Sequence, residues 1–297
     1  NWRRASQCET VSARTQGDGH LGVRIHHLSC GTMCPYGGRF MGGEGGLLTA
    51  AFKTADMCCH CLLIETEQGL VLVDSGLGMD DIRKPERLGS FFRHTVRPVL
   101  RAEETALAQV LQLGFKAEDV RHVVLTHLDL DHAGGIADFP GAKVHVFDPE
   151  FEAAMAPSLR ERLRYVQGQW SHGPDWVRHR VDGEQWFGFE AIRAIPGLAP
   201  DVLLIPLTGH TRGHCGVAVR KRDRWMIHCG DAYFFRGEVE LPASCPIGLM
   251  AFQNLVQING PQRLRNQRRL RELKAVHGAE VDLFCAHDTV ELNRHRA

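Results

Sequence analysis

Apolar residues recur in two patterns along the chain. Short apolar and β-branched runs bounded by turn residues predict strands over residues 23–25, 59–66, 69–73, 120–125, 143–147, 202–206, 215–220 and 224–228. Residues 61–76 have the pattern of a hairpin. Apolar positions three or four residues apart predict helices over residues 103–113, 149–167 with a break at Pro157, and 261–277. Strand-rich halves that each carry helices predict a layered α/β protein whose halves share one plan.

Three segments show neither pattern. Residues 1–20 are polar, and we expect a flexible leader there. Residues 31–48 contain seven glycines and predict a loop. Residues 168–190 mix aromatic and turn residues, which predicts a lid or a pocket wall. The aromatic side chains either form an apolar wall for an acyl chain or belong to the core: Trp170, Trp176, Trp186, Phe187 and Phe189.

Composition narrows the class of protein. Thirty-five basic and 35 acidic residues cancel, so no electrostatic reason remains to expect nucleic acid or an anionic membrane as partner. No apolar run approaches the roughly 18 residues of a membrane span, and no signal-peptide pattern opens the chain, so we expect a cytoplasmic protein. The arginine-rich helix over 261–277 fits a core stripe of Leu264, Leu270, Leu273 and Val276 with a solvated basic face.

Histidine and aspartate gather where predicted strands end. The segment LTHLDLDHAGG places four metal-ligand side chains within six positions, namely His127, Asp129, Asp131 and His132. The competing interpretation is a polar turn in which Asp131 caps a helix. Four further strand ends carry such residues, at Asp74, at His210 with His214, at Asp231 and at His287. Together they predict an active-site face at one edge of the sheets.

Cysteines near residue 60 give a weaker signal. Cys58, Cys59 and Cys61 are nearly adjacent, whereas tetrahedral zinc sites use separated pairs. We therefore expect no metal there, and we expect His60 to face the pocket. The other cysteines, including Cys229, are expected to be small buried side chains.

The order of these motifs resembles the metallo-β-lactamase superfamily. The motifs are Asp74 in VDSG, then His-x-x-x-Asp-His, GHTxGH, GDA and AHD. The resemblance implies the metallo-β-lactamase fold, a four-layer αββα sandwich, as a single domain over residues 21–297. It implies that one metal ion binds His127, position 129 and His210, and that a second binds Asp131, His132 and His287. Asp231 would bridge them, with a metal-bound hydroxide as nucleophile. Asp74 and His214 would support these ligands without binding metal.

Position 129 departs from the family, which usually has histidine there. An ionised Asp129 adds a negative charge, which makes the first ion a weaker Lewis acid and favours a harder metal. We expect two divalent ions, zinc in the first instance, with iron or manganese as alternatives at the Asp129 site. Diiron flavoproteins of the superfamily carry a carboxylate here too, but this chain shows no flavin-binding extension. A second interpretation is that Asp129 is too short to ligate and holds a water.

Residues near both ends resemble the N-acyl homoserine lactonase branch, including HHLSCGTMCP and the helix leading to FCAHD. That branch has a carbonyl-polarising tyrosine three residues after the bridging aspartate. Here Phe234 occupies that position and Tyr233 precedes it. We expect Asp131, Asp231 and Tyr233 to be catalytic, although on a strand the shift would reverse the direction of Tyr233.

The predicted function is hydrolysis of lactones or carboxylic esters by a binuclear metal site, with a small molecule as partner. A glyoxalase-type thioesterase or a promiscuous phosphotriesterase is the alternative within hydrolases. From another class, a non-hydrolytic diiron redox or oxygen-binding protein fits the carboxylate-rich site. Nucleic acid and membrane are not expected as partners, and homodimerisation is left open.

Overall fold

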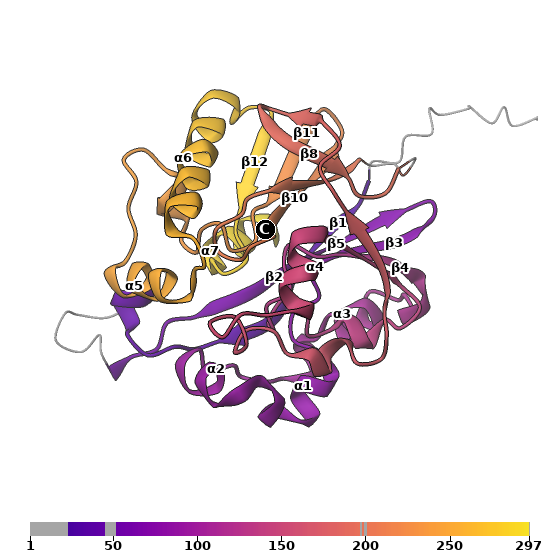
Figure 1. Cartoon of the computed structure of the whole chain (residues 1–297), viewed down its shortest axis with the longest axis horizontal. Helices are drawn as coiled ribbons and strands as arrows, with labels where there is room; N and C mark the ends of the chain where they lie inside the picture. The colour runs from indigo at the N-terminus through magenta and orange to yellow at the C-terminus, as the bar shows by residue number, and fades with distance from the viewer. Residues whose placement is uncertain (1–22, 45–51, 197, 199–200, 297) are drawn as a thin grey trace, which may run out of the picture.

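The computed structural model describes residues 23–44, 52–196, 198 and 201–296. The predicted leader over residues 1–20 lies outside these residues. The N-terminal part of the chain, from indigo to magenta, occupies the lower part of Figure 1, and the C-terminal part, from orange to yellow, occupies the upper part. The strands up to β6 form one six-stranded sheet, and the strands from β7 onward form the other.

The first sheet follows the order of the sequence. Its strands are β1 (Ile25–Met33), β2 (Met57–Thr66), β3 (Gly69–Val73), β4 (Val120–Val124), β5 (Lys143–Phe147) and β6 (Asp175–His179). The pairs β1–β2 and β2–β3 are antiparallel, and the pairs from β3 to β6 are parallel. Parallel strands direct their carboxyl ends to one edge, which is where Asp74 and the loop after β4 lie.

The second sheet has the order β12-β11-β10-β9-β8-β7. Its strands are β7 (Glu184–Trp186), β8 (Phe189–Arg193), β9 (Val202–Pro206), β10 (Cys215–Lys221), β11 (Arg224–His228) and β12 (Val281–Phe284). All neighbours pair antiparallel except β11 and β12, which are parallel. The parallel pair brings Asp231 and His287, which follow β11 and β12, to the same end of the sheet.

Alternation along the strands divides the core into layers. Leu62 and Ile64 of β2 pack with Leu204 of β9 between the sheets, whereas Leu63 faces the opposite side of its sheet. Because successive side chains on a strand point to opposite faces, each sheet buries both faces. The all-apolar stretches of β2 and β3 are what a sheet covered on both sides requires.

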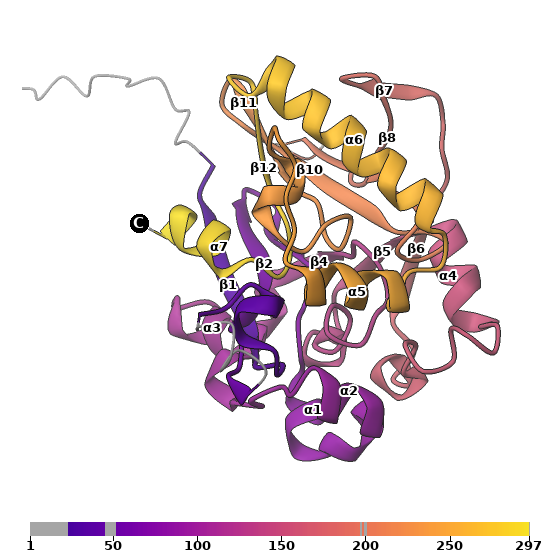
Figure 2. The same cartoon turned by 90° about the vertical axis from the view of Figure 1, so that its left-hand side faces the viewer.

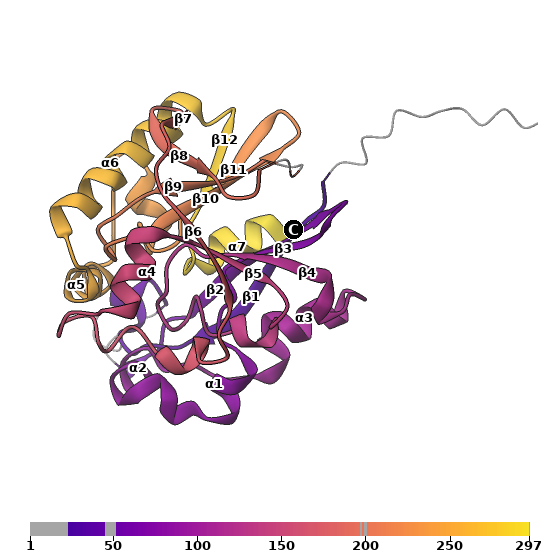
Figure 3. The same cartoon turned by 45° about the vertical axis from the view of Figure 1, so that its right-hand side comes forward.

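Helices form the two outer layers (Figures 2 and 3). The α-helices are α1 (Met79–Arg83), α2 (Gly89–Thr95), α3 (Ala106–Gln112), α4 (Asp148–Met155), α5 (Ile247–Val256), α6 (Gly260–His277) and α7 (Thr289–Arg296). Short 3-10 helices span Gly38–Met41, Pro85–Leu88, Ala102–Glu104, Ala117–Asp119, Ile136–Asp138, Gln167–Trp170 and Arg236–Val239. Val110 of α3 and Ala153 of α4 pack outside the first sheet, and Leu270 of α6 packs outside the second. The predicted four-layer αββα sandwich is confirmed.

Several predicted boundaries were wrong. The first strand runs to Met33, so the predicted loop over 31–48 begins inside it. The helix predicted over 103–113 is the shorter α3, which Thr105 caps by accepting a hydrogen bond from the Ala108 amide. The helix after β5 ends at Met155, before Pro157. The predicted lid over 168–190 instead contains β6, β7 and the start of β8.

The core stripe predicted for α6 was only half right. Leu270 and Leu273 are buried, but Leu264 and Val276 are exposed. The remaining buried face is polar and includes Arg263 and Gln267. Among the described residues, no helix combines the length and apolar character needed to cross a membrane.

Candidate metal centre

The loop after β4 is held from behind by Asp74. This carboxylate accepts hydrogen bonds from the Thr126 amide at 2.7 Å, the Thr126 hydroxyl at 2.7 Å and His132 Nδ1 at 2.8 Å. Burial has the largest single effect and would raise the pKa of Asp74, but the adjacent His132 ring together with other nearby histidines keeps that pKa below its usual value. Asp74 therefore orients the loop without entering its concave face, as the sequence predicted.

Three imidazoles are held in the same tautomer. Nδ1 of His132 donates to Asp74, and Nδ1 of His287 donates to the Cys58 carbonyl at 2.8 Å. The Thr126 hydroxyl donates to Asp74, so it accepts from His127 Nδ1 at 2.9 Å. In each ring the Nε2 atom faces the centre and offers a lone pair there when the ring is neutral. Such hydrogen bonds from the far nitrogen are typical of histidines that bind metal.

The side chains predicted as ligands converge in two clusters. In the first, Asp129 Oδ2 lies 3.0 Å from His210 Nε2 and 3.5 Å from His127 Nε2. Asp231 Oδ2 completes this cluster, 3.3 Å from His210 Nε2 and 3.7 Å from His127 Nε2.

The second cluster forms around the other oxygen of Asp231. Asp231 Oδ1 lies 3.0 Å from His287 Nε2 and 3.3 Å from His132 Nε2. Asp131 Oδ2 is 3.8 Å from His287 Nε2. The two oxygens of Asp231 thus belong to different clusters, which is the arrangement of a carboxylate that bridges two ions.

The donor set fits metal ions. Within the described part of the chain, His127 Nε2, His132 Nε2 and Asp231 Oδ1 are buried without any hydrogen-bond partner. Unpartnered buried polar atoms are costly and need a cause. Ligands about 2.1 Å from a tetrahedral ion lie roughly 3.4 Å apart, and the observed separations scatter around that value.

The carboxylates of the centre affect the pKa values of its histidines. Burial has the largest effect on the pKa of His132 and of His287 and would lower both, but the nearby carboxylates together, Asp231 first among them, raise both. Burial prevails at His210 and lowers its pKa to about 4. A cation that binds the second cluster therefore has to displace protons, whereas His210 offers its lone pair already.

Glycine and histidine bring Asp231 into place. Gly230 has a φ of +52°, and a Cβ atom there would lie 2.6 Å from His214 Nε2. His214 Nδ1 donates to the Leu207 carbonyl, and its Nε2 accepts from the Asp231 amide at 2.8 Å. Both nitrogens of His214 are therefore used, which agrees with the expectation that it supports ligands without being one.

Two supporting residues were missed by the sequence interpretation. The first is Glu150, whose buried carboxylate joins the loop after β4 to the loop after β9. It accepts from the Leu128 amide at 2.9 Å, the Thr211 hydroxyl at 2.6 Å, the Gly213 amide at 3.0 Å and the Tyr165 hydroxyl at 3.1 Å. The second is Arg164, which pairs with Asp129 at 3.1 Å. No motif or spacing in the sequence marked either residue.

A cavity of about 420 Å³ opens over the two clusters. Asp129, Asp131, His210, Asp231 and His287 line its inner end. Most of the remaining wall is apolar and comes from Met33, Met41, Met57, Phe91, Phe92, Phe234, Phe252 and Leu255. This volume and lining are those of a small-molecule site.

The cavity walls bear on three predictions. Tyr233 is fully buried and directs its hydroxyl to Glu291, 3.2 Å away, whereas Phe234 lines the cavity, so Tyr233 does not reach the cavity in which its predicted catalytic role would place it. Of the two interpretations of the aromatic residues over 168–190, packing in the core holds for Trp170, Trp186 and Phe189. His60 does not face the pocket, because it packs on Phe284 and hydrogen-bonds to His27.

The cysteines near residue 60 lie outside the two ligand clusters. Over the described ranges, Cys58, Cys59 and Cys61 join no cluster of metal-ligand side chains. The nine described cysteines are free thiols, and seven of them, including Cys229, are buried.

Comparisons with known proteins agree with this fold and centre. The profile of the metallo-β-lactamase superfamily matches residues 58–278. The "Probable metallo-hydrolase Rv2300c" of Mycobacterium tuberculosis is 46% identical over 267 residues, which cover 90% of this chain and 80% of that protein. An N-acyl homoserine lactonase of Bacillus cereus is 32% identical over 168 residues, 56% of this chain and 60% of that enzyme.

A solved structure gives the same fold. It is an N-acyl homoserine lactone hydrolase with the product N-hexanoyl-L-homoserine bound at its catalytic metal centre. It matches with a TM-score of 0.67 at 20% sequence identity, over 92% of this chain and 97% of that one. The profile match over residues 58–278 and the relative at 46% identity show that the chain belongs to the metallo-β-lactamase superfamily.

Proposed function

We propose that the protein is a binuclear metal-dependent hydrolase that opens lactones or cleaves carboxylic esters bearing an apolar chain. The observation that carries this proposal is an apolar cavity that ends on two ligand clusters joined by Asp231. The similarity to N-acyl homoserine lactonases supports the lactone as the first substrate to test. Zinc is the metal we expect in both clusters, because imidazole nitrogen and carboxylate oxygen are ligands that it accepts.

The bound ions, Asp231 and Asp131 would have separate roles in the reaction. Two bound divalent ions would lower the pKa of a water molecule and polarise the substrate carbonyl. Asp231 sets the spacing of the clusters, since each of its oxygens faces a different pair of histidines. Asp131 lines the cavity, and we assign to it the transfer of the proton from the attacking water to the leaving alkoxide.

The apolar walls hold the acyl chain and exclude bulk water. Phe234 lies beside the centre, with its ring centroid 5.0 Å from that of His287. It offers no hydroxyl to the carbonyl, so carbonyl polarisation would fall mainly to the bound ions. We therefore expect slower turnover than in an otherwise equal site that has a tyrosine there.

The test combines metal analysis with a substrate panel. The purified protein is assayed for metal by mass spectrometry and then offered N-acyl homoserine lactones of increasing chain length, aryl esters, thioesters and phosphotriesters. We expect two metal equivalents per chain and the highest kcat/KM on a lactone with a long acyl chain. A thioester or phosphotriester hydrolysed faster than every lactone would replace the proposed substrate. Iron with a visible absorption band and no hydrolysis would favour a diiron redox protein instead.

Variants connect the activity to the centre. His210→Ala should reduce lactone hydrolysis at least about 100-fold, because it removes one donor of the first cluster. His172→Ala is the matched control, since His172 is exposed and lies outside the cavity lining. Equal loss in both variants would show that the assay reports general damage and not the centre.

A further inference from the structure

The two oxygens of Asp129 face different groups. Oδ2 lies in the first cluster, 3.0 Å from His210 Nε2 and 3.5 Å from His127 Nε2. Oδ1 is turned away and accepts a hydrogen bond from Arg164 Nη1 at 3.1 Å. One carboxylate thus connects the candidate metal centre to a guanidinium from a distant part of the chain.

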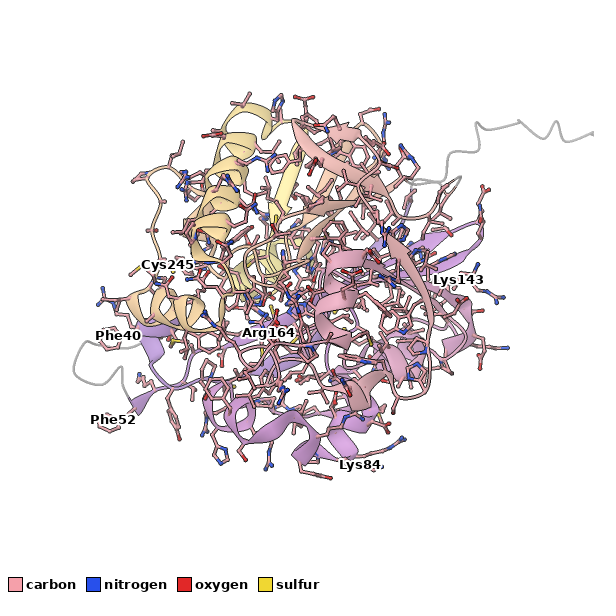
Figure 4. All side chains as sticks on the ribbon, in the orientation of Figure 1. Phe40, Phe52, Lys84, Lys143, Arg164 and Cys245 are labelled. Carbon is pink, nitrogen blue, oxygen red and sulfur yellow. The ribbon has the colours of Figure 1, made fainter. Side chains whose placement is uncertain are left out.

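Arg164 is fixed independently of Asp129. Its Nη2 atom donates to the Val256 carbonyl at the end of α5, and its Nη1 atom lies 3.5 Å from the His210 carbonyl. The side chain is 11% exposed, and Figure 4 labels Arg164 near the middle of the molecule. Because two backbone carbonyls hold the guanidinium in place, its hydrogen bond determines where Oδ1 of Asp129 lies.

The positive charge of Arg164 also affects the net charge at position 129. A histidine there would be a neutral ligand, whereas an ionised aspartate brings one negative charge. The guanidinium brings one positive charge to the same carboxylate. Arginine side chains stay protonated in proteins, so the guanidinium is charged.

We propose that Arg164 is a positioning residue of the metal centre, which holds Asp129 so that only Oδ2 is offered to the first ion. The Asp129–Arg164 pair then substitutes for a neutral histidine, with one ligating atom and no net charge. This inference rests on the proposed metal centre, but it does not depend on lactones being the substrate.

A purely structural role for Arg164 is the alternative to exclude. Two arginines contact the carboxyl end of α5, because Arg160 Nη2 donates to the Gln257 carbonyl at 2.7 Å while Arg164 contacts Val256. Cationic groups stabilise helix carboxyl ends whatever else they do. Only Arg164 also contacts Asp129, so Arg160→Gln is the matched control that removes a contact to the end of α5 and leaves Asp129 untouched.

The experiment measures metal binding without any substrate. The wild type and the variants R164Q, R164K, R160Q, D129H and D129H/R164Q are stripped of metal, and zinc affinity is measured by competition with a chromogenic chelator. Absorption spectra of the cobalt-loaded proteins report the geometry of each site. Circular dichroism establishes that each variant is folded.

We expect R164Q to bind one of the two ions about 10- to 100-fold more weakly, as is typical when a partner of a ligand is removed. R164K should recover part of the loss, and R160Q should bind both ions as the wild type does. D129H should also bind weakly, because it leaves the guanidinium beside a dication without its carboxylate. The double variant D129H/R164Q should bind more tightly than D129H.

The proposal would be overturned by wild-type zinc affinity in R164Q. It would equally be overturned by D129H binding as tightly as D129H/R164Q, a comparison that stays decisive if R164Q itself does not fold. A protein that binds no ions would end both this inference and the proposed function. Two coupled ions in a protein that hydrolyses no lactone or ester would end the proposed function alone.

Discussion

Replacing Asp74 by asparagine should weaken the metal centre without removing any of its ligands. Asp74 has a φ of +53°, a conformation that asparagine tolerates well, and the two side chains have the same shape. The backbone is therefore expected to stay in place. What changes is the ability to accept three hydrogen bonds at once.

The size of the effect follows from the three donors. The Thr126 amide binds Oδ1, while the Thr126 hydroxyl and His132 Nδ1 both bind Oδ2. Asparagine has a single acceptor oxygen, and its NH₂ group takes the position of the other carboxylate oxygen. At least one of the three donors therefore loses its acceptor. Hydrogen bonds to charged groups contribute about 1.5–3 kcal/mol each, and a buried unpaired donor adds its desolvation cost, so we expect the free energy of unfolding to fall by about 2–4 kcal/mol. His132 loses its anchor, which should reduce metal affinity about 10- to 100-fold.

Two measurements check this prediction. Urea unfolding of the metal-free protein gives the stability change, and chelator competition gives the affinity change. Asp282→Asn is the control, because Asp282 forms a surface ion pair with Arg294 at 3.0 Å, and such pairs are worth about 0–1 kcal/mol. Metal affinity and stability of D74N equal to those of D282N would refute the role derived for Asp74.

Three further predictions concern residues that do not line the cavity. In Glu150→Gln an NH₂ group replaces one acceptor oxygen and then faces other donors, either the Thr211 hydroxyl and Gly213 amide or the Leu128 amide. The free energy of unfolding should fall by about 2–4 kcal/mol, and an unchanged Tm in thermal unfolding would contradict this prediction. Tyr233→Phe should cost about 1 kcal/mol in urea unfolding and leave kcat/KM unchanged, whereas a large loss of kcat/KM would restore a catalytic role for Tyr233. Burial lowers the pKa of His145 to about 3, so its stabilisation is present above pH 6.5 and lost at about 1.4 kcal/mol per pH unit as the pH falls toward 3. Unfolding titrations at pH 7, 6 and 5 should show a shallower dependence in H145Q, and equal slopes would exclude His145 as the cause.

Most central strands were predicted well, and most edge strands were not. The predicted strand over 143–147 coincides with β5, and the hairpin of β2 and β3 was recognised. By contrast, β1 was given too short a span, and β6 and β7 were missed, as was the central strand β8. The strands β1, β6 and β7 are edge strands of their sheets, where one side is unpaired and polar residues are tolerated. An apolar pattern is therefore clearest for strands that are covered on both faces.

The buried face of α6 shows a second limit of periodicity. Asn266 donates to the Thr208 carbonyl, Gln267 donates to the Ala232 carbonyl, and Arg263 donates to Gln253. This face covers loops next to the metal centre, where backbone carbonyls need donors, so polar side chains are buried there instead of leucines. Leu264 and Val276 look like core positions only if the helix is assumed to lie on an apolar surface.

The candidate ligands were predictable because each follows a strand, and strand ends meet at one edge of a sheet. Their partners were not, because Glu150 and Arg164 reach the centre through tertiary contacts that leave no periodic trace. Arg164 changes the conclusion drawn from the charge of Asp129. If only the ligands are counted, the extra carboxylate of Asp129 makes the first ion a weaker Lewis acid. The Arg164 guanidinium, 3.1 Å from that carboxylate, neutralises the added negative charge. The preference for a harder metal then rests on the oxygen donor of Asp129 alone and no longer on the net charge of the site.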